Sequence, residues 1–215
     1  SKKEATFYWN EAIKPEVKAA DLIRPEKEAA DKYRKMGFGT VLSHQQDGIL
    51  RGTSALVALN EEDDFKLLQA ESASHYAFNK GSSKQTYPSS LMGMIALIRQ
   101  VHFDAKWYAE NQKSTAYNRS LSAVLETQNL PKIFDANGAL SQLRADKIGD
   151  EFGFQFILKG NGTEFQRIQD IKETGAPLIV PVKFPKAYDV SDPFASLQLS
   201  LSAMKDWELA PQNLR

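Results

Sequence analysis

Apolar and polar positions form two similar blocks in the second half of the chain. Each block is a short apolar run that breaks into a polar turn containing glycine, first over residues 130–138 and again over residues 156–162. A helical pattern follows each block, over residues 139–152 and 163–174, and a third apolar run covers residues 177–184. Strands that alternate with helices of this length predict a parallel sheet with helices outside it.

The first half of the chain carries shorter and weaker patterns. The predicted elements are helices over residues 11–22 and 25–36 and strands over residues 37–43, 54–59 and, less clearly, 67–78. Pro25 occupies a first-turn position and Gly37 follows the second helix as its stop. Ser89 or Ser90 then caps an amphipathic helix over residues 91–110, which we expect to pack outside the sheet.

Polar side chains stand where the two clearest strands end. Asp135 and Asn137 follow the first apolar run, and Lys159 and Asn161 follow the second. Because α/β enzymes bind ligands beyond the C-terminal ends of parallel strands, we interpret Asp135, Asn137 and Lys159 as candidate catalytic residues and Asn161 as a candidate substrate-binding residue. Residues 160–162 either form a tight turn or hold an anion by their backbone N–H groups.

Two further candidate substrate-binding residues lie in the first half of the chain. Lys80 belongs to a long aperiodic loop, residues 79–88, whose Gly, Ser and Lys content suits a lid or an anion site as well as a plain surface connection. His44 follows the strand predicted over residues 37–43 but has no partner at metal-ligand spacing, so an ordinary polar turn residue is the alternative. His75 and His102 are expected to be structural or on the surface.

Composition limits the partners and the compartment. The 215 residues carry 27 basic and 27 acidic side chains, and this zero net charge gives no electrostatic footprint for nucleic acid or an anionic membrane. The absence of cysteine excludes disulfides and a thiol nucleophile. No apolar stretch approaches the roughly 18 residues of a spanning helix, and no targeting segment is recognisable, so the cytoplasm and the periplasm both remain open.

Four segments carry a resemblance to a known family. Residues 36–41, 87–99, 149–165 and 175–181 resemble the imidazolonepropionase-like branch of the amidohydrolase superfamily and, more narrowly, large amidohydrolases of Bacteroidetes. The block Tyr87-Pro-Ser-Ser-Leu-Met-Gly93 is the most specific part. The resemblance covers nearly the whole chain and implies a metal-assisted hydrolase built on a TIM-type (β/α) barrel with parallel strands and outer helices.

The chain also departs from the pattern that this resemblance implies. The opening strand with its His-x-His pair and the late strand with its Asp are absent, so residues 1–215 are expected to be a single α/β domain, the central part of a barrel from a longer protein. Metal-binding relatives carry histidines where this chain has Asp135-Ala-Asn137 and Lys159-Gly-Asn161. A divalent metal, zinc above all, is therefore conceivable in the longer parent but is not expected in this chain.

Two functional hypotheses follow from this resemblance and its gaps. The first is that the parent hydrolyses C–N bonds other than peptide bonds, in a cyclic amide or peptide-like small-molecule substrate, and that this chain alone is inactive. The second is a degenerate barrel that serves as a non-catalytic small-molecule binding or structural module. The expected partners are the substrate, the rest of the parent polypeptide and, because an open sheet leaves edges unpaired, further copies of the chain.

Overall fold

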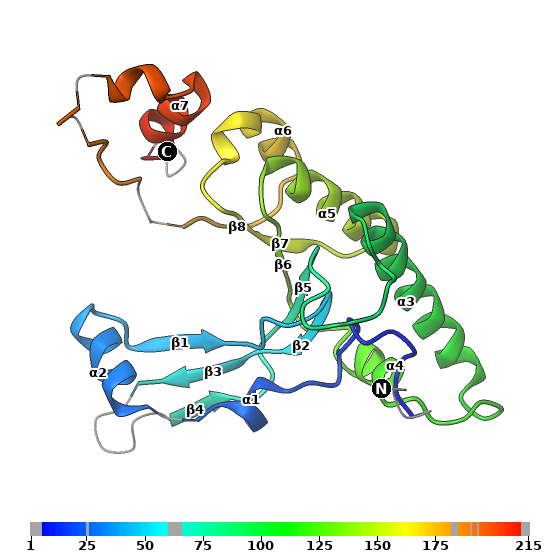
Figure 1. Ribbon diagram of the computed structural model, residues 1–215. Helices are drawn as coiled ribbons and strands as arrows, with labels where there is room; N and C mark the ends of the chain where they lie inside the picture. Colours follow the sequence, from blue (N-terminus) through cyan, green and yellow to red (C-terminus); the bar gives the residue numbers. More distant parts are fainter. Residues whose placement is uncertain are drawn as a thin grey trace. The chain divides into compact units, whose positions relative to one another are not determined.

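The computed structural model describes residues 6–24, 26–59, 66–181, 185–189, 191–192 and 194–211 (Figure 1). Pro25 and residues 182–184 of the third apolar run lie outside these ranges. The chain divides into two compact units, residues 1–133 and 134–215. None of the described helices is long and apolar enough to cross a membrane.

The first unit contains a small antiparallel sheet covered by short helices. Its elements are α1 (Ala19–Leu22), α2 (Lys27–Lys35), β1 (Thr40–Ser43), β3 (Ala55–Ala58) and β4 (Lys66–Gln69). The strand order is β1-β3-β4, and both pairs are antiparallel. Ala55, Val57 and Ala19 form the buried centre, against which Ile23 and Val41 pack. Strands were predicted over these parts of the chain, but not this antiparallel arrangement, which suits a connection as short as the one between β3 and β4.

A second antiparallel pair and two helices complete this unit. They are β2 (Leu50–Thr53), β5 (Ser74–Ala77), α3 (Leu91–Asn111) and α4 (Arg119–Glu126). The side chain of Ser90 accepts a hydrogen bond from the Gly93 N–H, so the predicted cap of the long helix is confirmed. The buried face of α3 includes Leu97, Ile98 and Val101, which are fully shielded from solvent.

The second unit contains the predicted strand-turn-helix blocks. Its elements, taken from the strand that leads into it, are β6 (Lys132–Asp135), α5 (Ala139–Phe152), β7 (Phe156–Lys159), η1 (Glu164–Arg167), α6 (Ile168–Glu173), β8 (Leu178–Ile179), η2 (Ala195–Gln198) and α7 (Leu201–Leu209). β7 and β8 pair in parallel. The rings of Phe134 and Phe156 meet edge to face at 5.1 Å in its core.

The two strands that carry the candidate site run side by side in the same direction. Ala136, directly after β6, donates its N–H to the carbonyl of Lys159, the last residue of β7, at 3.0 Å. Their C-terminal ends therefore lie together, as the alternation of strands and helices predicts. The architecture is α/β, and the strands that the structure describes form open sheets without closing into a barrel.

Candidate functional site

The candidate site is the edge of the second unit where β6 and β7 end. Ala136 is fully buried, whereas Asp135 and Asn137 on either side of it are partly or fully exposed. Because successive side chains of an extended segment point to opposite faces, Asp135 and Asn137 share the outer face. The same alternation places Lys159 and Asn161 together on β7 and the turn that follows it.

Asp135 and Lys159 form an ion pair across this edge. Lys159 Nζ lies 3.6 Å from Asp135 Oδ1, a separation that fits side chains at the ends of two neighbouring parallel strands. The Asp135 side chain is 34% exposed and the Lys159 side chain is 38% exposed, which leaves both charges in contact with solvent. An ion pair of this exposure contributes about 0–1 kcal/mol to folding. The pair therefore orients two charged groups at the exposed ends of β6 and β7 more than it stabilises the unit.

Asn137 and Asn161 form a second cross-strand pair. Asn161 Nδ2 donates to Asn137 Oδ1 at 2.6 Å. Asn161 Oδ1 accepts from the backbone N–H of Thr163 at 3.3 Å and from the Thr163 hydroxyl at 2.7 Å. Four of the predicted site residues are thus brought together as two lateral pairs, Asp135 with Lys159 and Asn137 with Asn161.

The buried carboxylate of Glu164 holds the turn that follows β7, and Glu164 was not among the residues predicted from the sequence. It is only 1% exposed, and its Oε1 accepts from the Asn161 N–H at 2.9 Å and from Gln142 Nε2 at 2.8 Å. A Cβ added at Gly160 would lie 1.8 Å from this oxygen, so the glycine makes room for the carboxylate. The bond from the Asn161 N–H to the Glu164 carboxylate is one half of an N-terminal capping box, whereas Asn161 Oδ1 accepts from Thr163 instead of from the Glu164 N–H. The spacing Asn-x-x-Glu was the available signal.

This network explains the Gly-Asn-Gly sequence after β7. The Asn161 N–H, one of the backbone donors proposed to hold an anion, is already bonded to the Glu164 carboxylate. Gly162 has φ +98°, a conformation that favours glycine. The geometry therefore favours the tight turn over an anion cradle.

The remaining two predicted residues belong to the first unit. His44 stacks on His75 with ring centroids 3.9 Å apart and an interplanar angle of 8°. Lys80 Nζ donates to the backbone carbonyl of Gln85 at 3.0 Å, within its own loop. These contacts give both side chains a local structural partner, and their roles in substrate binding stay predictions.

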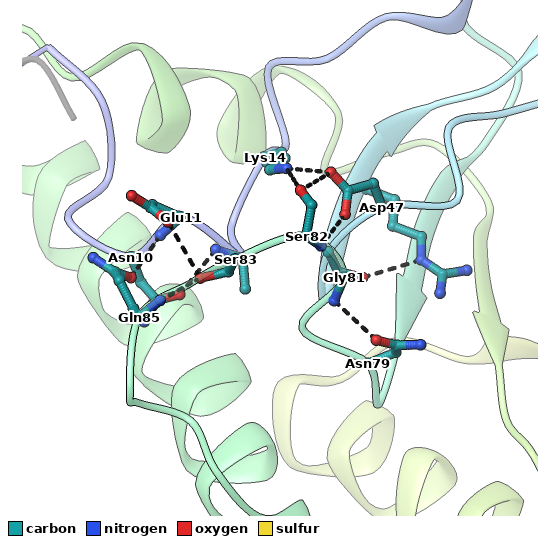
Figure 2. Close-up of polar contacts among 12 residues, drawn as sticks. Asn10, Glu11, Lys14, Asp47, Asn79, Gly81, Ser82, Ser83 and Gln85 are labelled. Atoms are coloured by element: carbon teal, nitrogen blue, oxygen red, sulfur yellow. Dashed lines mark hydrogen bonds and ion pairs between the residues drawn. The ribbon is translucent and has the colours of Figure 1, made fainter. Parts of the chain in front are cut away.

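The loop over residues 79–88 is fixed to the first unit by polar contacts (Figure 2). Asp47 accepts the backbone N–H of Ser82 at 2.6 Å and the Ser82 hydroxyl at 2.8 Å, and it is also ion-paired with Lys14. Gln85 accepts the Glu11 N–H at 2.9 Å and donates to the Trp9 carbonyl at 3.1 Å. Because the loop is held at both Ser82 and Gln85, these contacts favour a structural connection over a movable lid.

The donors at the β6–β7 edge do not fit a divalent metal. Asp135 supplies a carboxylate already facing an ammonium, and the nearby amides of Asn137 and Asn161 are bonded to each other. A lysine cation opposes a metal ion, and zinc prefers histidine, cysteine and carboxylate ligands. Across the described residues, no three His, Cys, Asp or Glu side chains gather in a metal-holding group.

The architecture and the polar strand ends define a class: an α/β protein whose chemistry would lie at the C-terminal ends of parallel strands. No model of a known protein family and no curated protein matches the chain. Among solved structures, it is similar to the crystal structure of amidohydrolase from Thermotoga maritima MSB8, with a TM-score of 0.67 and 21% sequence identity.

The similarity covers 84% of this chain and 53% of the Thermotoga chain, so this chain spans about half the length of that protein. At this identity the match concerns the fold. It supports the α/β architecture that was expected from the sequence.

Proposed function

We propose that the chain is part of a hydrolase of the amidohydrolase kind that cleaves C–N bonds other than peptide bonds in a small-molecule amide. The observation that carries the proposal is the pairing of Asp135 with Lys159 and of Asn137 with Asn161 at the C-terminal ends of parallel strands. In this architecture that edge is where substrates bind. The imidazolonepropionase-like branch is the narrower assignment that we favour.

The residues at this edge suit different parts of such a reaction. Asp135 is the candidate to accept a proton from the attacking water, because its carboxylate is partly exposed and held by the ion pair with Lys159. Asn137 and Lys159 carry N–H donors suited to an oxygen on which negative charge develops. Asn161 and Glu164 hold the turn in place.

The metal and the remaining ligands of the reaction would come from the rest of the parent polypeptide. A zinc ion would lower the pKa of bound water and polarise the scissile carbonyl when bound. The residues at the β6–β7 edge do not supply its ligands, so we propose that this chain alone has no activity. The small-molecule substrate and the remainder of the parent are its proposed partners.

A second candidate function is a non-catalytic binding or structural module. The observation that favours it is the replacement of the expected histidines by a closed set of polar pairs, in which Asn161 is bonded to Asn137, Thr163 and Glu164. Such a set can bind a polar ligand without activating water.

Activity measurements on the longer parent and on the 215-residue chain separate these functions. Both proteins are tested against a panel of linear and cyclic amides, and bound metal is measured by elemental analysis. The hydrolase proposal expects turnover by the parent and a loss of at least about 100-fold with Asp135→Asn, the scale of a lost general base. Asp170→Asn is the matched control, because Asp170 is an exposed partner in an ion pair with Arg167.

Turnover that survives Asp135→Asn unchanged would remove Asp135 from the mechanism. Amide binding without turnover or bound metal in the parent would establish the binding module instead. Metal-dependent turnover by the 215-residue chain itself would contradict the proposal that the metal ligands come from the rest of the parent.

A further inference from the structure

The hydrogen bonds after β7 determine which way the Asn161 amide faces. The backbone N–H of Thr163 donates to Asn161 Oδ1, and a backbone N–H is always a donor. The Thr163 hydroxyl contacts the same oxygen at 2.7 Å. Asn161 therefore directs its amide oxygen towards Thr163 and its amide nitrogen towards Asn137.

This polarity is passed on to Asn137. Asn161 Nδ2 donates to Asn137 Oδ1 at 2.6 Å, so the Asn137 amide oxygen is the group that faces Asn161. The Nδ2 of Asn137 is on the other branch of the amide and faces away. Asn137 is exposed, and none of the described residues accepts a hydrogen bond from its Nδ2. Asn137 thus presents N–H donors to solvent at the candidate site.

An acceptor lies next to this donor. Asp135 is two residues earlier on the same face, which separates the two Cα atoms by about 7 Å. A carboxylate has about four acceptor positions, so Asp135 can accept a hydrogen bond from a ligand in addition to the contacts that it makes within the protein, among them the one with Lys159. The Asp135 carboxylate itself repels an anionic ligand group, so the site favours an uncharged one.

We propose that Asn137 donates a hydrogen bond to a carbonyl oxygen of the ligand while Asp135 accepts one from a neighbouring ligand N–H. The group recognised is then an uncharged primary or cis amide, whose oxygen and N–H point to the same side. A trans secondary amide directs them to opposite sides and cannot reach two residues of one strand together. This inference rests on the proposed function for the location of the site and goes further by assigning the amide geometry and the role of Asn137.

The first test is a nuclear magnetic resonance titration of the unmutated chain with benzamide. Benzoate has the same shape but carries a charge and lacks the N–H donor, and N,N-dimethylbenzamide keeps the carbonyl without an N–H. Benzamide is expected to shift the side-chain NH2 resonances of Asn137, which are identified by their loss in Asn137→Asp. The two analogues are expected to bind roughly tenfold more weakly or worse, because each loses a hydrogen bond to the charged Asp135.

Two variants test the direction of the Asn137 amide. Asn137→Asp keeps an oxygen for Asn161 but removes the donor, and Asn161→Asp offers an acceptor that turns the Asn137 amide around. Both are expected to weaken benzamide binding roughly tenfold, although only Asn137 touches the ligand. Gln169→Glu makes the same amide-to-carboxylate change at an exposed position of α6 and should bind normally.

Several results would overturn the inference: no Asn137 shift with benzamide, benzoate binding as tightly as benzamide, or normal affinity in both variants. Circular dichroism establishes that the variants are folded, and the titration of the unmutated chain does not depend on them. Benzamide binding with no turnover of any amide by the parent would defeat the proposed hydrolysis and leave this inference intact. Turnover by the parent with no shift of the Asn137 resonance would support the proposed hydrolysis and overturn this inference.

Discussion

The Asp47 carboxylate accepts both the backbone N–H and the hydroxyl of Ser82, at 2.6 and 2.8 Å, across 35 positions of sequence. The Lys14 ammonium completes this contact (Figure 2). Burial raises the pKa of Asp47, but the hydrogen bonds from Lys14 and Ser82 outweigh it and lower the pKa from 3.8 to about 2. The ionised carboxylate is therefore the form that fastens the loop over residues 79–88.

Asp47 should make the stability of the first unit depend on acid pH. Since the pKa is lower in the folded state than in the unfolded chain, the stabilisation is complete above about pH 4 and is lost as pH falls towards about 2. With the side chain 23% exposed, we expect a contribution of about 1–2 kcal/mol after screening. Asp47→Asn should lose this amount at pH 6, measured by urea unfolding.

Measurements at two pH values separate the effect of the Asp47 charge on stability from the effect of its side-chain shape. Between pH 6 and pH 3 the stability gap between the unmutated chain and Asp47→Asn should shrink. Lys14→Met should reproduce part of the loss at pH 6, because the lysine is one of the groups that lower the Asp47 pKa. A gap that stays constant with pH would show that the carboxylate does not titrate as described.

Gly81 should be irreplaceable at the same contact. It has φ +62°, and an added Cβ would lie 1.9 Å from Asp47 Oδ1 and 2.4 Å from the Gly48 backbone nitrogen. Gly37, in the same unit, has φ +94° and nothing within 4 Å of such a Cβ, so Gly37→Ala tests backbone strain alone. We expect about 1 kcal/mol for Gly37→Ala and about 3 kcal/mol for Gly81→Ala in urea unfolding. Equal losses of stability in the two variants would mean that the loop shifts to accommodate the added Cβ at Gly81 with no loss of free energy.

The features that the sequence predicted correctly are local ones. The helix that became α3 has its cap in Ser90 and its apolar face within the same segment. The turns after β6 and β7 follow directly from short apolar runs and their glycines. Because each of these signals is complete within about 20 residues, hydrophobic period and capping chemistry were enough to predict them. The meeting of Asp135 with Lys159 then followed from the parallel order of their strands.

The features that it did not predict depend on partners far apart in sequence. The contact between Asp47 and Ser82 joins two loops that carry no periodic pattern. The antiparallel pairing of β1, β3 and β4 depends on which faces become buried together, and four-residue strands reveal little of this. Glu164 was overlooked because a charged residue at the start of a helical pattern is ordinarily exposed, whereas here Gly160 leaves space to bury it.

His102 should give the first unit a second, separate pH dependence. Its ring stacks on Tyr76 at 6.0 Å, and burial together with the nearby Lys132 ammonium lowers the His102 pKa from 6.5 to about 4. Because protonation is less favourable in the folded state, the stability is intact above about pH 6.5 and falls as pH drops towards about 4. The full effect is about 3 kcal/mol.

Urea unfolding at pH 7.5 and pH 4.5 measures this effect, with tryptophan fluorescence as the signal. The Trp207→Phe background confines the signal to Trp9 and Trp107 of the first unit. His102→Asn should flatten the dependence between these two pH values, whereas His44→Asn, at a partly exposed site, should preserve it. Retention of the full slope in His102→Asn would assign the effect to another group.

The Asp135–Lys159 pair provides the last prediction, and the exposure of both side chains determines the size of the expected effect. A buried pair would lose about 3–5 kcal/mol when one partner is removed. Here both side chains are more than one-third exposed at a separation of 3.6 Å, so an unpaired Lys159 remains hydrated. The cost of Asp135→Ala should therefore stay below about 1 kcal/mol.

A double-mutant cycle of Asp135→Ala and Lys159→Ala measures the pair directly. The coupling free energy from urea unfolding should lie between about 0 and 1 kcal/mol and should decrease in 1 M salt, because exposed charges are screened. Asp135→Ala should at the same time weaken benzamide binding roughly tenfold or more, since Asp135 accepts the ligand N–H in the proposed complex. A coupling above about 2 kcal/mol that resists salt would instead make the pair a structural ion pair, and unchanged benzamide binding would remove Asp135 from the site.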